Sequence, residues 1–272
     1  MRHMPIDQRM ESYQSFYDHS WAKQADALAR HTPLEDPLFD VCVSWKEAAN
    51  TARLPWLTAH SAESFAIGFA SVQSPFTQRV LRDLRDTVVK ACQLDLTREQ
   101  RQKIASWFDQ RHAATRRAVE RESKVVLAET ASKERFWSEV IQLPEWGLSI
   151  EGSQRLAFAA VYFAYEHFLY RSYVIKTGLT DYRIGQQFKQ DFTAAFNEEL
   201  CDECWTHSGV ELGRLVRNAL CHNGGRLTKY LENRKRELRI EDGQIQIWPE
   251  DVKKLFDLLK SRVYIMITAC LK

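Results

Sequence analysis

The sequence predicts an all-α fold, a helical bundle with one small β-hairpin before the C-terminal helix. Apolar residues recur with helical spacing through most of the 272 residues, and capping signals punctuate that pattern. Strict alternation of apolar and polar residues occurs once, between Leu238 and Ile247. Apolar residues make up 44% of the chain, enough for a sizeable core.

Helical spacing predicts a series of helices before residue 145, over 7–30, 38–53, 56–72, 74–93, 97–131 and a shorter one that ends at Ile141. The segment from His31 to Pro37 should break the first. We expect Pro55 to end the second, because the residue before a proline is pushed out of the α region. Pro75 suits a first helical position, and Thr97 to Gln100 have capping-box spacing.

The second half is expected to contain helices over 152–177, 181–205, 209–222 and 249–271. The stretch Pro144-Glu145-Trp146-Gly147 is the predicted boundary between the halves. We therefore predict a helical region of unknown role over 1–145 and a helical bundle over 146–272.

The alternating sequence from Leu238 to Ile247 is interrupted by Asp242-Gly243, a strong two-residue hairpin turn. Folding about this turn would place Ile240 opposite Ile245 and Leu238 opposite Ile247, which gives the hairpin one apolar face.

Charge and cysteine usage predict a soluble cytoplasmic protein. The 38 basic and 36 acidic groups nearly cancel, so any nucleic-acid binding must be local. The six cysteines show no framework spacing, and Met1 to Met10 lack the apolar core of a signal peptide. The most apolar run, 156–175, is interrupted by Glu166, His167 and Arg171, so we expect a buried helix and no membrane span.

The helix predicted over 209–222 is unusually well delimited. Ser208 and Glu211 have capping-box spacing at its start, and Asn223-Gly224-Gly225 is a typical C-terminal stop. His222 therefore falls in the last turn, where the helix dipole favours a cationic imidazole.

Helical geometry sets the faces of this helix. Arg214, Asn218 and His222 recur every four residues and share one stripe, whereas Arg217 lies about 140° round from His222 at 3.6 residues per turn. The side chains of Arg217 and His222 would come together only if the helix bends locally, or if a second subunit brings the end of its own helix next to this one.

These residue types suit cleavage of RNA without a metal or cofactor. A histidine can take the proton from a ribose 2′-hydroxyl or return one to the leaving oxygen. The Arg217 guanidinium can pair with the phosphate and stabilise its developing charge. Asn218 would orient either group.

The segment from Leu215 to Gly225 resembles the HEPN superfamily, whose ribonucleases carry Arg, a polar residue, three to five others and then His. The resemblance implies a metal-independent RNA endonuclease that works as a homodimer with a composite cleft. Many such proteins are toxins or antiviral effectors, so a cognate antitoxin or regulatory protein is a further expected partner. Arg217 and His222 would be the catalytic pair. Some members place a tyrosine two residues after the histidine, where this chain has Gly224.

Further residues are expected to support this site. Glu166 would pair with Arg217 or orient His222, the alternative being a salt bridge with Arg171; Arg214 and Asn223 would also contribute. A locally basic stretch that includes an aromatic ring would guide RNA, through Arg226, Lys229, Tyr230, Arg234, Lys235 and Arg236.

Other interpretations stay open at this stage. A histidine at a helix C-terminus also caps carbonyls without any catalytic role. An inactive HEPN-like scaffold that binds a protein or nucleotide would carry the same pattern. Cys201, Cys204 and His207 would suit zinc, but a lone CxxC has no second pair and small apolar packing explains it equally well.

Overall fold

The structure is a computed structural model that describes residues 14–58, 144–179, 184–185 and 187–270, with isolated positions between 83 and 117. The chain divides into two compact units, Met1–Leu57 with Glu145–Lys272, and Thr58–Pro144. The helices expected over 74–93, 97–131 and up to Ile141 belong to the second unit and lie outside the described residues, apart from those isolated positions.

The first unit joins two distant stretches of the chain. Its limit at Glu145 coincides with the expected boundary, but the described residues up to Leu57 pack with the C-terminal part. Trp45 shows why, since its fully buried ring lies 5.7 Å from that of Trp21 and 5.1 Å from that of Phe256. Its indole Nε1 also donates to the Val161 carbonyl at 2.9 Å. One side chain thus connects helices from both stretches.

The first described helix, α2, spans His19–Ala29. Residues 14–18 are not helical, so a continuous helix from residue 7 is wrong for this stretch, while residues 1–13 lie outside the description. The reason is Asp18, an N-cap whose carboxylate accepts from the amides of Ser20 and Trp21, each at 3.0 Å.

The next helix runs over residues 35–58, through Pro55, so the predicted stop before this proline is wrong. A proline removes one helical donor and costs stability. Tertiary contacts offset that cost here: Trp56 is buried, and Gln154 Nε2 donates to the Ala52 carbonyl at 3.0 Å. The continuation predicted beyond residue 58 lies outside the described residues.

Two long helices form the centre of this unit. Helix α6 spans Pro144–Thr177 and begins earlier than the predicted start at 152, while α10 spans Pro249–Cys270 as expected. The apolar stripe of α10 is buried, which confirms its helical spacing, through Val252, Leu255, Phe256, Leu259 and Val263. No described helix is both long and apolar enough to cross a membrane.

The single helix expected over 181–205 is instead broken into three pieces. These are α7 (Phe188–Ala195), α8 (Glu198–Cys201) and a π-helical turn (Asp202–Thr206). The break falls at Asn197, whose side chain accepts from the Leu200 amide at 2.7 Å and starts a new helix.

Helix α9 spans Ser208–His222, and a 3₁₀ turn follows over Glu232–Glu237. Strands β1 (Arg239–Glu241) and β2 (Gln244–Gln246) then pair antiparallel. Ile240 lies opposite Ile245, as predicted. The turn residues Asp242 and Gly243 have φ of 51° and 75°, which suit a two-residue hairpin.

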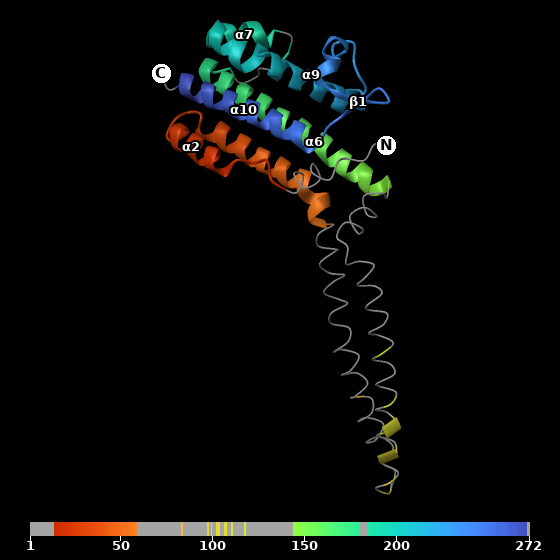
Figure 1. Ribbon diagram of the computed structural model, residues 1–272. Coiled ribbons are helices and arrows are strands. Elements are labelled where there is room, and N and C mark those ends of the chain that lie inside the picture. The colour runs from red at the N-terminus through yellow and green to blue at the C-terminus, as the bar shows by residue number, and fades with distance from the viewer. Residues whose placement is uncertain are drawn as a thin grey trace. The chain divides into compact units, whose positions relative to one another are not determined.

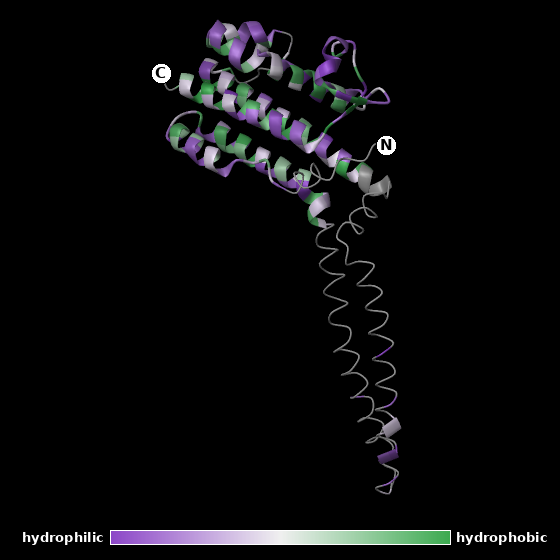
Figure 2. Ribbon diagram, in the orientation of Figure 1, coloured by the Kyte–Doolittle hydropathy of each residue, from purple (hydrophilic) through white to green (hydrophobic). Residues whose placement is uncertain are grey.

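Within this unit the elements are arranged in layers (Figure 1). Helix α2 and the helix over 35–58 form one layer, α6 and α10 the next, and α7 and α9 with the hairpin the outer one. Most helices carry hydrophobic and hydrophilic residues together, whereas the segment between α9 and β1 is largely hydrophilic (Figure 2). The outer layer therefore presents a polar segment directly after α9.

Candidate functional site

Helix α9 has well-formed ends, but its N-cap differs from the prediction. His207, not Ser208, is the cap: its Nδ1 accepts from the Gly209 amide at 3.2 Å, while Ser208 is already helical. The expected stop is confirmed, because Gly224 and Gly225 have φ of 59° and 78°. The helix therefore ends where the sequence predicts, with His222 as its last residue.

The rotational setting of α9 is fixed by close packing at Gly213. A Cβ there would lie 2.9 Å from Leu255 Cδ1 of α10 and 3.2 Å from the Tyr162 ring of α6. Both helices approach the α9 backbone closely, so this face must point inward. That setting decides which polar residues of α9 are buried.

Arg217 faces α6 and is only 8% exposed. Its Nη2 donates to both carboxylate oxygens of Glu166, each at 2.7 Å. The guanidinium carbon lies 4.5 Å from the Phe163 ring centroid and 5.3 Å from that of Tyr162. Of the two pairings considered for Glu166, the structure has the one with Arg217, whereas Arg171 pairs with Asp40 at 3.0 Å.

The electrostatics of this pair follow from its burial. Desolvation raises the pKa of Glu166, and the adjacent charge of Arg217 opposes that rise. Only Nη2 of the guanidinium serves the carboxylate in these bonds, and Arg217 Nε is buried without a hydrogen-bond partner. The Arg217 guanidinium is thus bound by the Glu166 carboxylate, while its Nε–H has no hydrogen-bond partner.

His222 lies on the other side of α9 and is exposed. The opposite burial of Arg217 and His222 agrees with their predicted angular separation. On the stripe of His222, Asn218 is half-buried, and Arg214 stacks over the Trp205 ring at 4.5 Å. Arg214 therefore packs against Trp205, while Asn218 remains near the end of α9.

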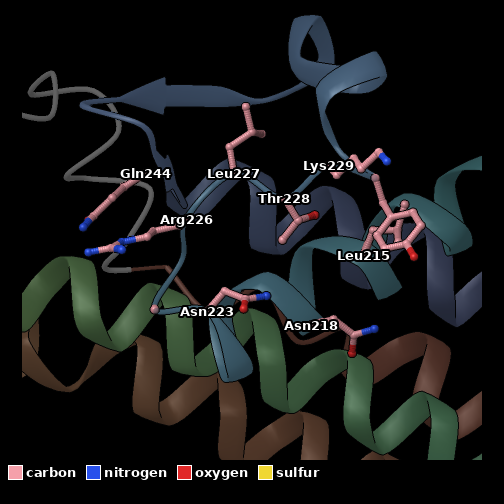
Figure 3. Close-up of a pocket in the computed structure, with 10 residues that line it drawn as sticks. Leu215, Asn218, Asn223, Arg226, Leu227, Thr228, Lys229 and Gln244 are labelled. Atoms are coloured by element: carbon pink, nitrogen blue, oxygen red, sulfur yellow. The ribbon is translucent and has the colours of Figure 1, made fainter.

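A cavity of about 790 Å³ opens between the C-terminal half of α9 and the segment that follows it (Figure 3). We call it the α9 cavity; it is lined by Leu215, Asn218, Asn223, Gly224, Arg226, Leu227, Thr228, Lys229, Tyr230 and Gln244. It brings together two expected catalytic or supporting residues, Asn218 and Asn223, with three of the expected RNA-binding residues. Arg217 and His222 do not line it.

The remaining residues of the expected RNA-binding set divide into two kinds. Arg234 donates to both oxygens of Glu237, at 2.7 and 2.8 Å, and to the Ser208 carbonyl at 2.8 Å, so its charge is already used. Lys235 and Arg236 are exposed on the 3₁₀ turn. The two cations among the residues that line the cavity are Arg226 and Lys229.

Gln244 is a cavity residue that the sequence analysis did not single out. It begins β2, and an isolated bridge to Arg226 brings it beside the segment after α9. Arg155 of α6 donates to Gln244 Oε1 at 3.4 Å and to the Ile245 carbonyl at 3.2 Å. The Asp-Gly turn predicted the hairpin, but only the pairing with Arg226 places its second strand at the cavity.

The Cys201, Cys204 and His207 group serves packing and capping. The thiols donate to the carbonyls of Lys189 and Arg262, at 3.7 and 3.6 Å, and His207 caps α9. Burial raises the pKa of the Cys204 thiol to about 12, which disfavours the thiolate that zinc requires. Among the described residues, no three His, Cys, Asp or Glu side chains are grouped to hold a metal ion.

Comparison with protein-family models, curated proteins and solved structures finds no match for this chain.

Proposed function

We propose that this protein is a metal-independent RNA endonuclease of the HEPN type that acts as a homodimer. The observation that carries the proposal is the exposed His222 at the end of a helix whose last turns, with the segment after them, line a cavity that contains two cations and three side-chain amides. An imidazole in such a place has access to a solvent-exposed phosphodiester. Asn218 and Asn223 flank it in sequence and line that cavity.

The proposed reaction is an internal transesterification. His222 takes the proton of a ribose 2′-hydroxyl, the 2′-oxygen attacks the adjacent phosphorus, and the bond to the 5′-oxygen breaks. The leaving oxygen takes a proton from a second acid, which the second copy's imidazole would supply. The products are a 2′,3′-cyclic phosphate and a 5′-hydroxyl, so no oxidant, metal or cofactor is needed.

Arg217 is proposed to stabilise the charge that develops on the phosphate. Arg217 is buried, and its Nη2 is bonded to Glu166. Its guanidinium can therefore contact the substrate only through the edge that does not face Glu166. Arg226 and Lys229, which line the cavity, would attract the phosphate backbone of the RNA.

The test is cleavage of a structured RNA by the purified full-length chain in the presence of a chelator. Wild type should release fragments that end in 2′,3′-cyclic phosphate, and His222→Ala should release none with an unchanged melting temperature. His167→Ala is the matched control, since His167 is also exposed but lies on α6. If wild type and His222→Ala are equally inactive on several RNA classes, the nuclease proposal is wrong.

A second candidate is an inactive HEPN-like module that binds a protein or nucleotide partner. The buried Arg217–Glu166 pair favours it, because such a pair also has a purely structural role between α6 and α9. This candidate predicts that His222→Ala changes no RNA. Toxicity on cytoplasmic expression that His222→Ala relieves would favour the nuclease and its toxin-like role.

A further inference from the structure

The α9 cavity has different side chains at its two ends. Arg226 and Gln244 lie at one end, Leu215 and Lys229 at the other, and Asn223 and Thr228 between them (Figure 3). A cation thus lies at each end, while an amide and a hydroxyl lie between them.

Tyr230 adds a stacking surface to this groove. Its side chain is 77% exposed although it lines the cavity, so the ring is available to another planar group. An exposed aromatic ring beside cations is the usual means of holding single-stranded nucleic acid, because every base has a π-face.

The amides of the cavity provide donors and acceptors for a base edge. Arg155 donates to Gln244 Oε1, which orients the Gln244 amide so that its NH₂ group is the part offered to a ligand. Asn218 and Asn223 each present both a donor and an acceptor. The volume of about 790 Å³ is that of a small-molecule site and suffices for a nucleoside.

We infer that the α9 cavity is a subsite for one unpaired nucleoside next to the scissile bond, so that the protein acts on single-stranded segments of RNA. This inference rests on the proposed nuclease function. A base in an A-form duplex is stacked on both sides and paired along its edge, so it cannot meet Tyr230 and the amides together. The subsite adjoins the bond to be cut because α9 both ends in His222 and lines the cavity with Asn218.

The experiment measures binding rather than cleavage, and it uses the full chain carrying His222→Ala. The probe is a fluorescein-labelled RNA of twelve or so nucleotides without self-complementarity, alone or annealed to its complement, followed by anisotropy. Adding Tyr230→Ala should weaken binding of the single strand by about tenfold and leave the duplex unaffected. Tyr230→Phe should keep the affinity, and Tyr264→Ala, an exposed tyrosine of α10, is the matched control.

A second arm replaces single nucleotides of the probe by abasic ones. At one position the abasic probe should bind weakly and no longer respond to Tyr230→Ala, since the base that stacks on the ring is missing. Equal binding of single strand and duplex, or no effect of Tyr230→Ala, overturns the subsite. If the single strand binds as expected but wild type cuts no RNA, the nuclease function is refuted, while the cavity remains a binding site for an unpaired nucleoside.

Discussion

Removal of Glu166 should destabilise the protein strongly, because it leaves the buried Arg217 guanidinium without a counter-ion. The side chains of Arg217 and Glu166 are 9% and 17% exposed. Breaking a buried pair by removing one partner typically costs about 3–5 kcal/mol. Glu166 keeps some contact with water, so for Glu166→Ala we expect a loss of about 3 kcal/mol, the lower end of that range.

Urea denaturation followed by far-UV circular dichroism measures this loss. The matched control is Asp40→Ala, which breaks the pair with Arg171 on the same helix α6, where the side chains of Asp40 and Arg171 are 45% and 35% exposed. An exposed pair of this kind should lose less than about 1 kcal/mol. A Glu166→Ala variant as stable as the Asp40→Ala variant would refute the reasoning.

The double variant Glu166→Leu with Arg217→Met tests the same pair without leaving a charge behind. Apolar side chains of similar volume often replace a buried ion pair at no cost, so the double variant should lie within about 1 kcal/mol of wild type. It also separates folding from chemistry, since it is a folded protein without Arg217. Loss of RNA cleavage in it would assign the Arg217–Glu166 pair to the reaction, whereas full cleavage would leave both residues a structural role only.

Three further outcomes are expected. Hydrogen bonds, first from Ser20, hold the pKa of Asp18 well below its usual 3.8, so its stabilising effect is present above that pH. The difference in unfolding free energy between wild type and Asp18→Asn should therefore shrink towards about pH 2. Gly213→Ala places a Cβ 2.9 Å from a leucine methyl of α10 and should lose about 1–3 kcal/mol, while Gly152→Ala, with nothing within 4 Å, should gain about 0.5–1 kcal/mol in the same urea assay. Arg226→Ala should lower the slope of log affinity for RNA against log salt by about 1, whereas the exposed Lys253→Ala should not.

Local chemistry predicted those features whose partners are close in sequence. The hairpin register with Ile240 opposite Ile245 follows from alternation and an Asp-Gly turn, and both lie within a few residues. The stop of α9 at Asn223 follows from two glycines that accept positive φ. In each case the determining contact is made within one turn or one hairpin.

Predictions that depended on distant partners were wrong or incomplete. The helix continues through Pro55, next to which Trp56 is buried and Gln154 donates to the Ala52 carbonyl, and neither contact is visible from the local pattern. The sequence offered Glu166 two partners, and only the packing of α9 on α6 selected Arg217. Gln244 joins the cavity through strand pairing with a residue before the hairpin. Tertiary placement decided all of these.

The exposed His222 and the buried Arg217 set a clear requirement for the proposed reaction. One group must remove a proton and another must return one on the opposite side of the phosphorus, yet α9 offers a single exposed imidazole. If the second copy supplies the other imidazole, an equal, freely exchanged mixture of wild type and His222→Ala should retain about one quarter of the activity, because only wild-type homodimers keep both groups. If each chain works alone, the mixture should retain about half. If the mixture retains half of the activity, the composite site is refuted, while His222 is still the catalytic residue of each chain.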